Sequence, residues 1–215
     1  MPSRMIMGLV FGMLLQNSVV AQERSPSIWE NRLGVQPPLL VATTATGPHA
    51  KQYPFRPETY GKTSGHSPTT NMSKACILIY TRQLNSATLP LASAINEFTL
   101  KHFSLDPAYL LLFDVKGAQR GGYTVEEMTA RIKELEEISQ KNKLTGVSIG
   151  IAANPAYAEK AGLNNINDVA IVLLKTPTSS RKEPVIAWYQ MLSAKDLSAK
   201  TLSTLEADLE AVLKK

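Results

Sequence analysis

The chain of 215 residues contains a single cysteine, Cys76. One cysteine cannot form an internal disulfide, so the stability of the fold has to come from a hydrophobic core. The three histidines, at positions 49, 66 and 102, show no metal-ligand spacing and no partner cysteines for a zinc site. The sequence therefore excludes a disulfide-rich scaffold, and it predicts no metal and no cofactor.

Several motifs that carry chemistry are also missing. The glycines of Gly117-x-x-x-Gly121-Gly122 lack the Gly-Lys-Ser/Thr ending of a phosphate-binding loop. No Gly-x-Ser-x-Gly elbow accompanies the serines and histidines. The acidic cluster of Glu134, Glu136 and Glu137 is typical of a solvated helix face. The sequence therefore predicts neither a P-loop nucleotide-binding protein nor a serine hydrolase with this elbow.

Clustered positive charge is missing from most of the chain. The formal net charge is +5, but residues 75–215 hold 16 Lys and Arg against 15 Asp and Glu. The basic excess lies in residues 22–74, which hold six Lys and Arg against three Asp and Glu. Because nucleic-acid binding needs clustered neutralisation of phosphates, the sequence predicts no nucleic-acid partner.

The apolar run near the N-terminus is too short to span a membrane. Arg4 precedes an apolar stretch of 11 residues, Met5 to Leu15, and the small residues up to Ala21 suit cleavage. A membrane span needs roughly 20 apolar residues, so this pattern predicts a secretory signal peptide over residues 1–21 and no transmembrane segment after cleavage. The protein is therefore expected to be exported, either to a periplasm or as a fully secreted product.

Residues 22–74 have the composition of a tail or linker. They are rich in Pro, Ser, Thr and Gly and show no sustained helical or alternating periodicity. Such a segment cannot bury enough apolar surface to offset chain entropy, so we expect it to be mostly disordered. One apolar run, Leu39 to Ala42, could dock on the domain or add an edge strand.

The remaining residues, 75–215, alternate between apolar runs of strand length and amphipathic helical patterns. Thr124 and Glu127 form a capping box that starts one helix, and Ser198 is the expected N-cap of the last helix. The loop between the last two strands is too short for a crossover helix, so these strands form an antiparallel hairpin. The expected strands are residues 75–80, 109–113, 147–151, 169–174 and 185–191, with helices after the first, second, third and fifth.

The resulting order is βαβαβαββα, an α/β domain with a mixed sheet. The first strand, Ala75 to Tyr80, is apolar on both alternating faces, which is typical of a central strand. The helix after it is expected to start at Asn85 or Ser86, with Pro90 bending its first turns.

This order, with a proline early in the helix after the first strand, resembles the thioredoxin-like superfamily over residues 73–214. The extra strand and short helix at 147–162 look like a peroxiredoxin-type elaboration. In thioredoxins a Cys-x-x-Cys motif sits at the strand-to-helix turn, and counting back from Pro90 places Arg82 and Asn85 at those positions. The family's cis-proline is also replaced, because residues 165–168 read Asn-Ile-Asn-Asp. The resemblance thus implies a thioredoxin-like fold in which both parts of the redox site are absent.

The resemblance also implies that Arg82 lies near Asp168, because the turn faces the start of the fourth strand. One interpretation is a local ion pair that fills the vacated site. The other is an anion or peptide-carboxylate site made by Arg82 and the helix amides near Ser86 to Thr88. The candidate binding residues are thus Arg82, Asn85, Ser86 and Asp168.

Three functions remain open. The first is an exported, redox-inactive module that binds a protein or peptide partner of unknown identity. The second is a thiol-dependent oxidoreductase or peroxidase acting through Cys76, which would need an exposed thiol with a lowered pKa. The third is an envelope component whose basic tail touches an anionic polymer. We expect Cys76 to be an inert buried residue, which favours the first function.

Overall fold

The computed structural model describes residues 33–37, 41–52, 56–57, 72–113, 123–152, 157–164, 168–176 and 184–214. Both the expected signal peptide and residues 165–167 lie outside the described residues, so the expectations about them stay predictions.

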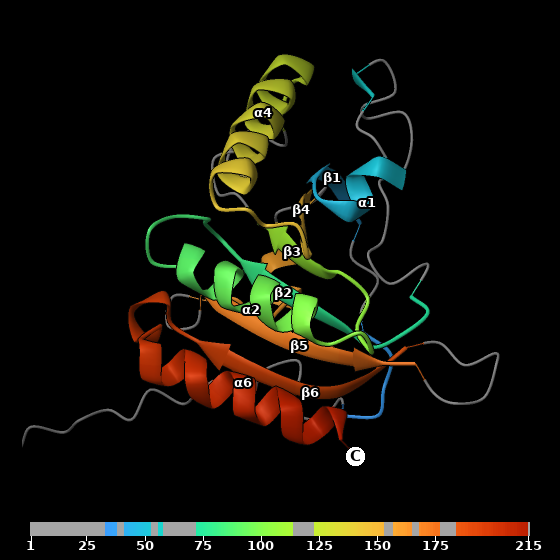
Figure 1. Cartoon of the computed structure of the whole chain (residues 1–215). Coiled ribbons are helices and arrows are strands. Elements are labelled where there is room, and N and C mark those ends of the chain that lie inside the picture. The colour runs from blue at the N-terminus through green and yellow to red at the C-terminus, as the bar shows by residue number, and fades with distance from the viewer. Residues whose placement is uncertain are drawn as a thin grey trace, which may run out of the picture.

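A six-stranded mixed sheet forms the centre of the molecule (Figure 1), with the strand order β1-β4-β3-β2-β5-β6. Neighbours β2, β3 and β4 run parallel, and β5 pairs antiparallel with both β2 and β6. The β5–β6 hairpin and the parallel β2–β3–β4 core confirm the expected mixed α/β sheet. The strands are Ala42–Thr46 (β1), Cys76–Thr81 (β2), Ala108–Leu112 (β3), Val147–Ala152 (β4), Val169–Lys175 (β5) and Val185–Leu192 (β6).

Strand β2 is buried along its whole length, as its apolar pattern predicts. Its alternating side chains enter two separate cores: Ile77 and Ile79 face one, and Leu78 and Tyr80 face the other. Burying a side chain of this size stabilises the fold by about 1.5–3 kcal/mol. The central sheet therefore supplies the stability that disulfides cannot.

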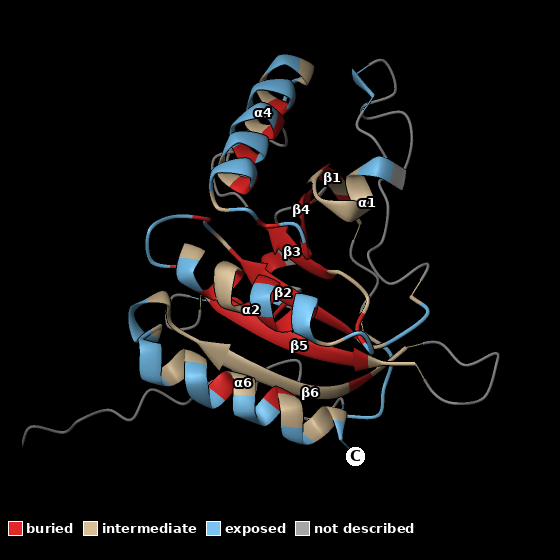
Figure 2. Ribbon diagram, viewed as in Figure 1, coloured by how far each residue is buried: buried red, intermediate tan, exposed pale blue. Residues whose placement is uncertain are grey.

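Three long helices contribute to the core on one face of the sheet (Figure 2), through residues such as Ile95, Leu135 and Leu205. The other face is covered in part by the short helix α5, through Ala158 and the residues that follow it. The helices are Pro48–Gln52 (α1), Leu89–Lys101 (α2), Val125–Lys141 (α4), Tyr157–Lys160 (α5) and Ala199–Leu213 (α6), with a 3₁₀ turn, Ala194–Asp196 (η2).

Helix starts at α4 and α6 follow the expected chemistry. The Thr124 hydroxyl accepts a hydrogen bond from the Glu127 amide, and the Glu127 side chain accepts one from the Thr124 amide. Ser198 caps α6 by accepting from the amide of Thr201. Both caps satisfy amides that have no partner within the helix.

The sheet begins earlier in the chain than residue 75. Ala42 to Thr46 form β1, which pairs antiparallel with β4 from Ala42↔Ala152 to Thr46↔Ile149. The apolar run Leu39 to Ala42 allows an edge strand, but the strand lies almost entirely beyond that run. Part of the segment expected to be disordered is thus an element of the fold.

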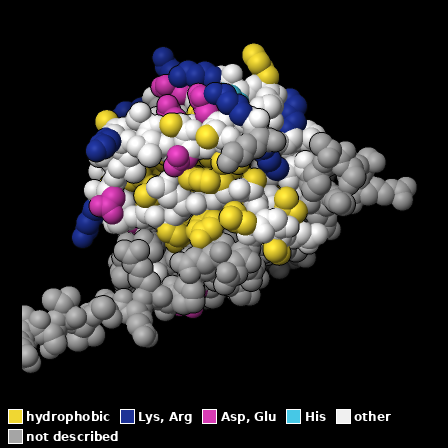
Figure 3. All heavy atoms as spheres, turned by 90° about the horizontal axis from the view of Figure 1, so that it is seen from below, with side chains coloured by type: hydrophobic (Ala, Val, Ile, Leu, Met, Phe, Trp, Pro, Cys, Tyr) yellow, Lys and Arg dark blue, Asp and Glu magenta, His cyan; other side chains and the backbone are white. Residues whose placement is uncertain are grey.

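The opposite edge of the sheet, β6, also receives the N-terminal segment. The Gly34 amide donates to the Ile186 carbonyl at 2.8 Å, and the Ile186 amide donates to the Val35 carbonyl at 2.9 Å. Figure 3 views the molecule from this side and shows hydrophobic side chains gathered in the middle of the face.

Helix α2 starts later than expected. Its first residue is Leu89, and Thr88 is its N-cap. Pro90 lies within the first two helical positions, where the missing amide would have had no helical partner. The proline is therefore accommodated in the first turn of the helix.

Candidate functional site

The candidate site is the turn from Arg82 to Thr88, which joins β2 to α2. The turn lies at the C-terminal end of the central strand β2, where Thr81 pairs with Leu112 of β3 and with Val169 of β5. Most of its residues are exposed, including Gln83, Asn85 and Ser86. The resemblance to thioredoxins places the position of their Cys-x-x-Cys motif in this turn.

Side-chain hydrogen bonds hold the turn in one shape. The Thr88 hydroxyl donates to the Gln83 carbonyl at 2.8 Å and accepts from the Asn85 amide at 3.0 Å. The Thr81 hydroxyl donates to the same Gln83 carbonyl at 3.0 Å. The Asn85 side-chain amide donates to Oε1 of Gln83 at 3.0 Å. Thr81 and Thr88 are buried, so the turn is a closed polar network on a fixed base.

Asn85 accepts hydrogen bonds from the backbone amides that precede and begin α2. Its Oδ1 accepts from the amides of Ala87 at 2.9 Å and Thr88 at 3.2 Å, and its carbonyl accepts from the Leu89 amide at 2.8 Å. An anion at this helix start would have to displace the Asn85 side chain. The amides expected to serve an anion site are therefore already satisfied, which removes the main support for that hypothesis.

Arg82 directly follows β2 and Asp168 directly precedes β5, and the adjoining residues Thr81 and Val169 are paired, so the two backbones meet as the sequence predicts. Their side chains do not pair. Nη2 of Arg82 donates to the Leu163 carbonyl at 3.1 Å, whereas Oδ1 of Asp168 accepts from the Ala194 amide. The expected ion pair is wrong for these two described residues. Each side chain instead fixes a neighbouring loop: the end of the α5 segment in one case and the start of η2 in the other.

Cys76 lies at the start of β2, and the turn follows the end of that strand. Five residues of extended backbone separate Cys76 from Thr81, roughly 17 Å at about 3.3 Å per residue. The thiol is buried, with 1% of the residue exposed, and Sγ donates to the Pro107 carbonyl at 3.4 Å. Burial, with a smaller effect of the Asp106 charge, raises the pKa of the thiol far above its usual range. The thiolate needed for redox chemistry is strongly disfavoured.

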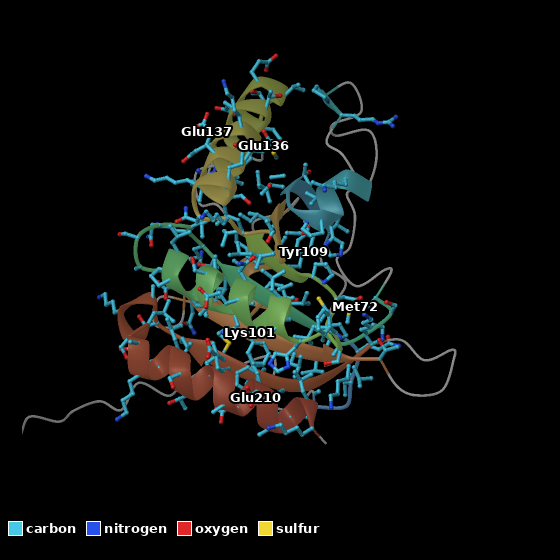
Figure 4. The ribbon with its side chains drawn as sticks, viewed as in Figure 1. Met72, Lys101, Tyr109, Glu136, Glu137 and Glu210 are labelled. Atoms are coloured by element: carbon cyan, nitrogen blue, oxygen red, sulfur yellow. The ribbon has the colours of Figure 1, made fainter. Side chains whose placement is uncertain are left out.

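A second polar cluster lies between β1, α1, β3 and β4. The hydroxyls of Thr44 and Tyr109 are 2.7 Å apart, and Figure 4 labels Tyr109 beneath α1. Ser148 Oγ lies 2.8 Å from Nδ1 of His49 and accepts from the His49 amide at 3.0 Å. Sequence reasoning missed this cluster because His49 and Thr44 belong to the segment read as a tail.

The second cluster anchors β1 and α1 to the sheet. Ser148 is fully buried, so its hydroxyl cannot reach a substrate despite its serine–histidine contact. Burial lowers the pKa of His49, and the negative charge of Asp106 offsets this in part. Burial also raises the pKa of Tyr109, with the hydrogen bond to Thr44 opposing it. The neutral forms of both side chains are favoured, as a structural role requires.

The described residues contain no group of three or more His, Cys, Asp or Glu side chains that could hold a metal ion. Within the same ranges no helix is both long and apolar enough to cross a membrane.

Comparison with known proteins gives structural neighbours only. No protein-family model matches the sequence, and no curated protein matches it. A solved structure from Bacteroides thetaiotaomicron, described as a candidate protein disulfide isomerase, is similar with a TM-score of 0.50 and 14% identity, covering 86% of this chain and 91% of that one. A peroxiredoxin-like protein from Aquifex aeolicus gives a TM-score of 0.47 and 12% identity, covering 82% of this chain and 86% of that one.

The strand order, the helix placement and the first of these likenesses define the fold. The chain has a thioredoxin-like fold, as its sequence resemblance implied. At this identity the likeness concerns the fold, and the function has to be argued from the residues of this chain.

Proposed function

We propose that this protein is an exported, redox-inactive thioredoxin-like module that binds a protein or peptide partner. The observation that carries the proposal is the position of its only cysteine, buried in the sheet at the opposite end of β2 from the turn. A thiol in that position can neither ionise readily nor reach a disulfide of another protein.

The turn itself supports a binding role. Three consecutive side chains there, Asn85 to Ala87, are exposed, and the Asn85 and Thr88 bonds fix the backbone before any partner arrives. A preorganised surface loses little conformational entropy on binding. Gln83, Asn85 and Ser86 are the residues we expect to touch the partner, with Arg82 and Asp168 holding the neighbouring loops in place.

Export rests on the sequence pattern of residues 1–21. Expression of the whole chain with a C-terminal tag, followed by cell fractionation and mass spectrometry of the purified product, tests this part. The proposal expects a product that begins at Gln22 in the exported fraction. A cytoplasmic product that retains Met1 would contradict it.

Binding at the turn is tested by site-specific photocrosslinking. A photoreactive amino acid replaces Ser86 in one chain and Lys133, on the exposed side of α4, in the control chain. The proposal expects one discrete crosslinked band from position 86 that is missing from position 133. An identical crosslinking pattern from both positions would refute a binding site at the turn.

The thiol-enzyme alternative is tested in parallel by insulin reduction and peroxide consumption. The proposal expects rates equal to those of a Cys76→Ala chain. Insulin reduction or peroxide consumption that disappears in the Cys76→Ala chain would show that the protein is a thiol-dependent enzyme and would refute redox inactivity.

A further inference from the structure

Residues 42–52, which form β1 and α1, are attached to one edge of the sheet, and we call them the strap. β1 is the outermost strand, and β4 is its neighbour in the sheet. The main contacts of α1 are with β1 and β4. Release of the strap would therefore leave the strands β4, β3, β2, β5 and β6 paired with one another.

The strap fits closely against β4. Ala42 and Ala45 of β1 are buried, one in each of the two cores. Gly47, between β1 and α1, has a left-handed backbone, and an added Cβ would lie 2.6 Å from Cα of Ser148. The strap is thus held by packing as well as by strand pairing.

His49 is the ionisable side chain of the strap that lies in this interface. Its ring packs against Tyr109, with ring centroids 5.4 Å apart and an angle of 69° between the planes. The fully buried Ser148 bonds to the ring and to the His49 amide. Protonation would turn Nδ1 from an acceptor into a donor, so the Ser148 hydroxyl could no longer donate to it. Among the described residues this hydroxyl has no other hydrogen-bond acceptor.

Few charged groups surround the ring. Neither β1 nor β4 contains an ionisable side chain, and the buried residues of α4, which packs on β1, are uncharged. Lys51 of α1 is exposed, and the phenol of Tyr109 is bonded to Thr44. The remaining group is Asp106, just before β3, whose carboxylate already accepts from the amides of Ser73 and Lys74.

Proton binding therefore favours the open strap over the closed one. Burial lowers the pKa of His49 in the closed strap below its ordinary value of 6.5, and the charge of Asp106 offsets only part of this effect. In the open strap the ring is in water and binds a proton near the ordinary value. As the pH falls below 6.5, the open strap gains protons first, so the equilibrium shifts toward it.

We propose that the strap is an acid-released element: protonation of His49 detaches β1 and α1 from β4 while the other five strands stay paired. An edge strand near a chain terminus is suited to this, because such elements open at lower cost than the core. Three of the five residues of β1 are threonines, whereas β4 carries Val147, Ile149 and Ile151. Acid would thus replace a threonine-rich sheet edge by an apolar one, which associates more readily with other strands.

The release does not involve the turn from Arg82 to Thr88. It is independent of the proposed partner binding, and either proposal can fail without the other.

The test compares two thiols in one chain, which starts at Gln22 and contains every described residue. Ala45→Cys places a small thiol at a buried position of the strap, and the native Cys76 reports on the core. Labelling with dithiodipyridine is followed by peptide mass spectrometry at about pH 8 and about pH 5, on either side of the ordinary histidine pKa. Each rate is divided by the rate of the same thiol in urea-unfolded protein at the same pH, which removes the effect of thiol ionisation.

We expect the relative rate at position 45 to rise about tenfold in acid, since each unit of pKa difference between the open and closed straps changes their ratio tenfold. The relative rate at Cys76 should stay constant. The control is Ala45→Cys combined with His49→Asn, which keeps a group that can bond to Ser148 but does not titrate. In this control the acid-dependent rise at position 45 should disappear.

Hydrogen exchange of the unmodified chain is the second measurement, and it decides the matter if Ala45→Cys opens the strap at neutral pH. After correction for intrinsic exchange, amides of residues 42–52 should lose protection in acid while those of residues 76–81 keep it. Three outcomes would overturn the acid-released strap: unchanged protection of residues 42–52, equal loss of protection in both segments, or the same acid response in the His49→Asn chain.

Discussion

Nδ1 of His49 lies 2.8 Å from the hydroxyl oxygen of Ser148, and the same oxygen accepts the His49 backbone amide at 3.0 Å. One buried serine of β4 thus holds both the ring and the backbone of a residue in α1. In the neutral imidazole, Nδ1 can accept the Ser148 hydroxyl proton while the oxygen accepts the amide. This pair links α1 to β4 and adds to the backbone pairing of β1 with β4.

Acid should weaken this link. Burial lowers the folded-state pKa of His49 below the value of 6.5 that applies to the unfolded chain. The unfolded state therefore binds more protons as the pH falls below 6.5, so the stability that this histidine contributes is present above that pH and is lost as the pH falls through the folded pKa. Urea unfolding at about pH 8 and about pH 5 measures the difference.

His49→Asn is the matched variant, because an amide side chain can bond to Ser148 but does not titrate. The expected result is a smaller loss of stability in acid for the variant than for the unmodified chain. Equal losses would show that His49 does not contribute to the pH dependence.

The bond between Thr44 and Tyr109 should be visible in a double-mutant cycle. Tyr109→Phe leaves the buried Thr44 hydroxyl without its partner and should cost about 1–2 kcal/mol of unfolding free energy. Thr44→Val combined with Tyr109→Phe should cost less than the sum of the single changes. Chemical denaturation of the four chains measures the coupling, and strict additivity would contradict the bond.

Two glycines with similar backbone angles should respond differently to alanine. Gly47 has φ +89°, and an added Cβ would lie 2.4 Å from the Val147 carbonyl oxygen. Gly34 has φ +78°, with nothing within 4 Å of an added Cβ. Gly34→Ala should cost about 1 kcal/mol for the left-handed backbone alone.

Gly47→Ala should cost more than Gly34→Ala, because the backbone of β4 would also have to move. Thermal unfolding of the two variants ranks them. Equal melting temperatures would mean that β1 and β4 lie further apart than the structure places them.

Asn85 should matter for stability and Ser86 only for binding. Asn85→Ala removes the acceptor of the Ala87 and Thr88 amides and should cost about 1 kcal/mol, as the loss of an N-cap does. Ser86→Ala, at an exposed position in the same turn, should leave the unfolding free energy unchanged while weakening partner binding. Thermal unfolding provides the first comparison and the crosslinking assay the second. A destabilising Ser86→Ala would show that the turn depends on this hydroxyl.

The strands that carry the core could be predicted because their sequences are unambiguous. The apolar runs around Ile77 and Ile171 have strand length and are buried on both faces. The residues Ala42 to Thr46 were harder to read, since alanines and threonines give no clear alternation, and the pairing with β4 depends on contacts distant in sequence. The late start of α2 follows from Asn85, which caps the turn before the helix instead of the helix itself.

At the candidate site, the sequence could predict backbone positions but not side-chain directions. Arg82 and Asp168 meet at one end of β2 and β5 because strand register fixes them. Their side chains bond to Leu163 and Ala194, which lie in loops whose paths no local pattern reveals. An arginine and an aspartate at adjacent positions were therefore insufficient to predict an ion pair.

The accessibility of the Cys76 thiol in the native protein decides between the binding module and the thiol-dependent enzyme. Native and urea-unfolded protein are treated with a thiol reagent, and modification of Cys76 is followed by intact-mass spectrometry. We expect labelling of the unfolded chain and essentially none of the native chain over the same period, because the thiol is buried and its pKa is raised. Rapid labelling of the native protein would show that Cys76 is accessible and would favour the thiol-dependent enzyme.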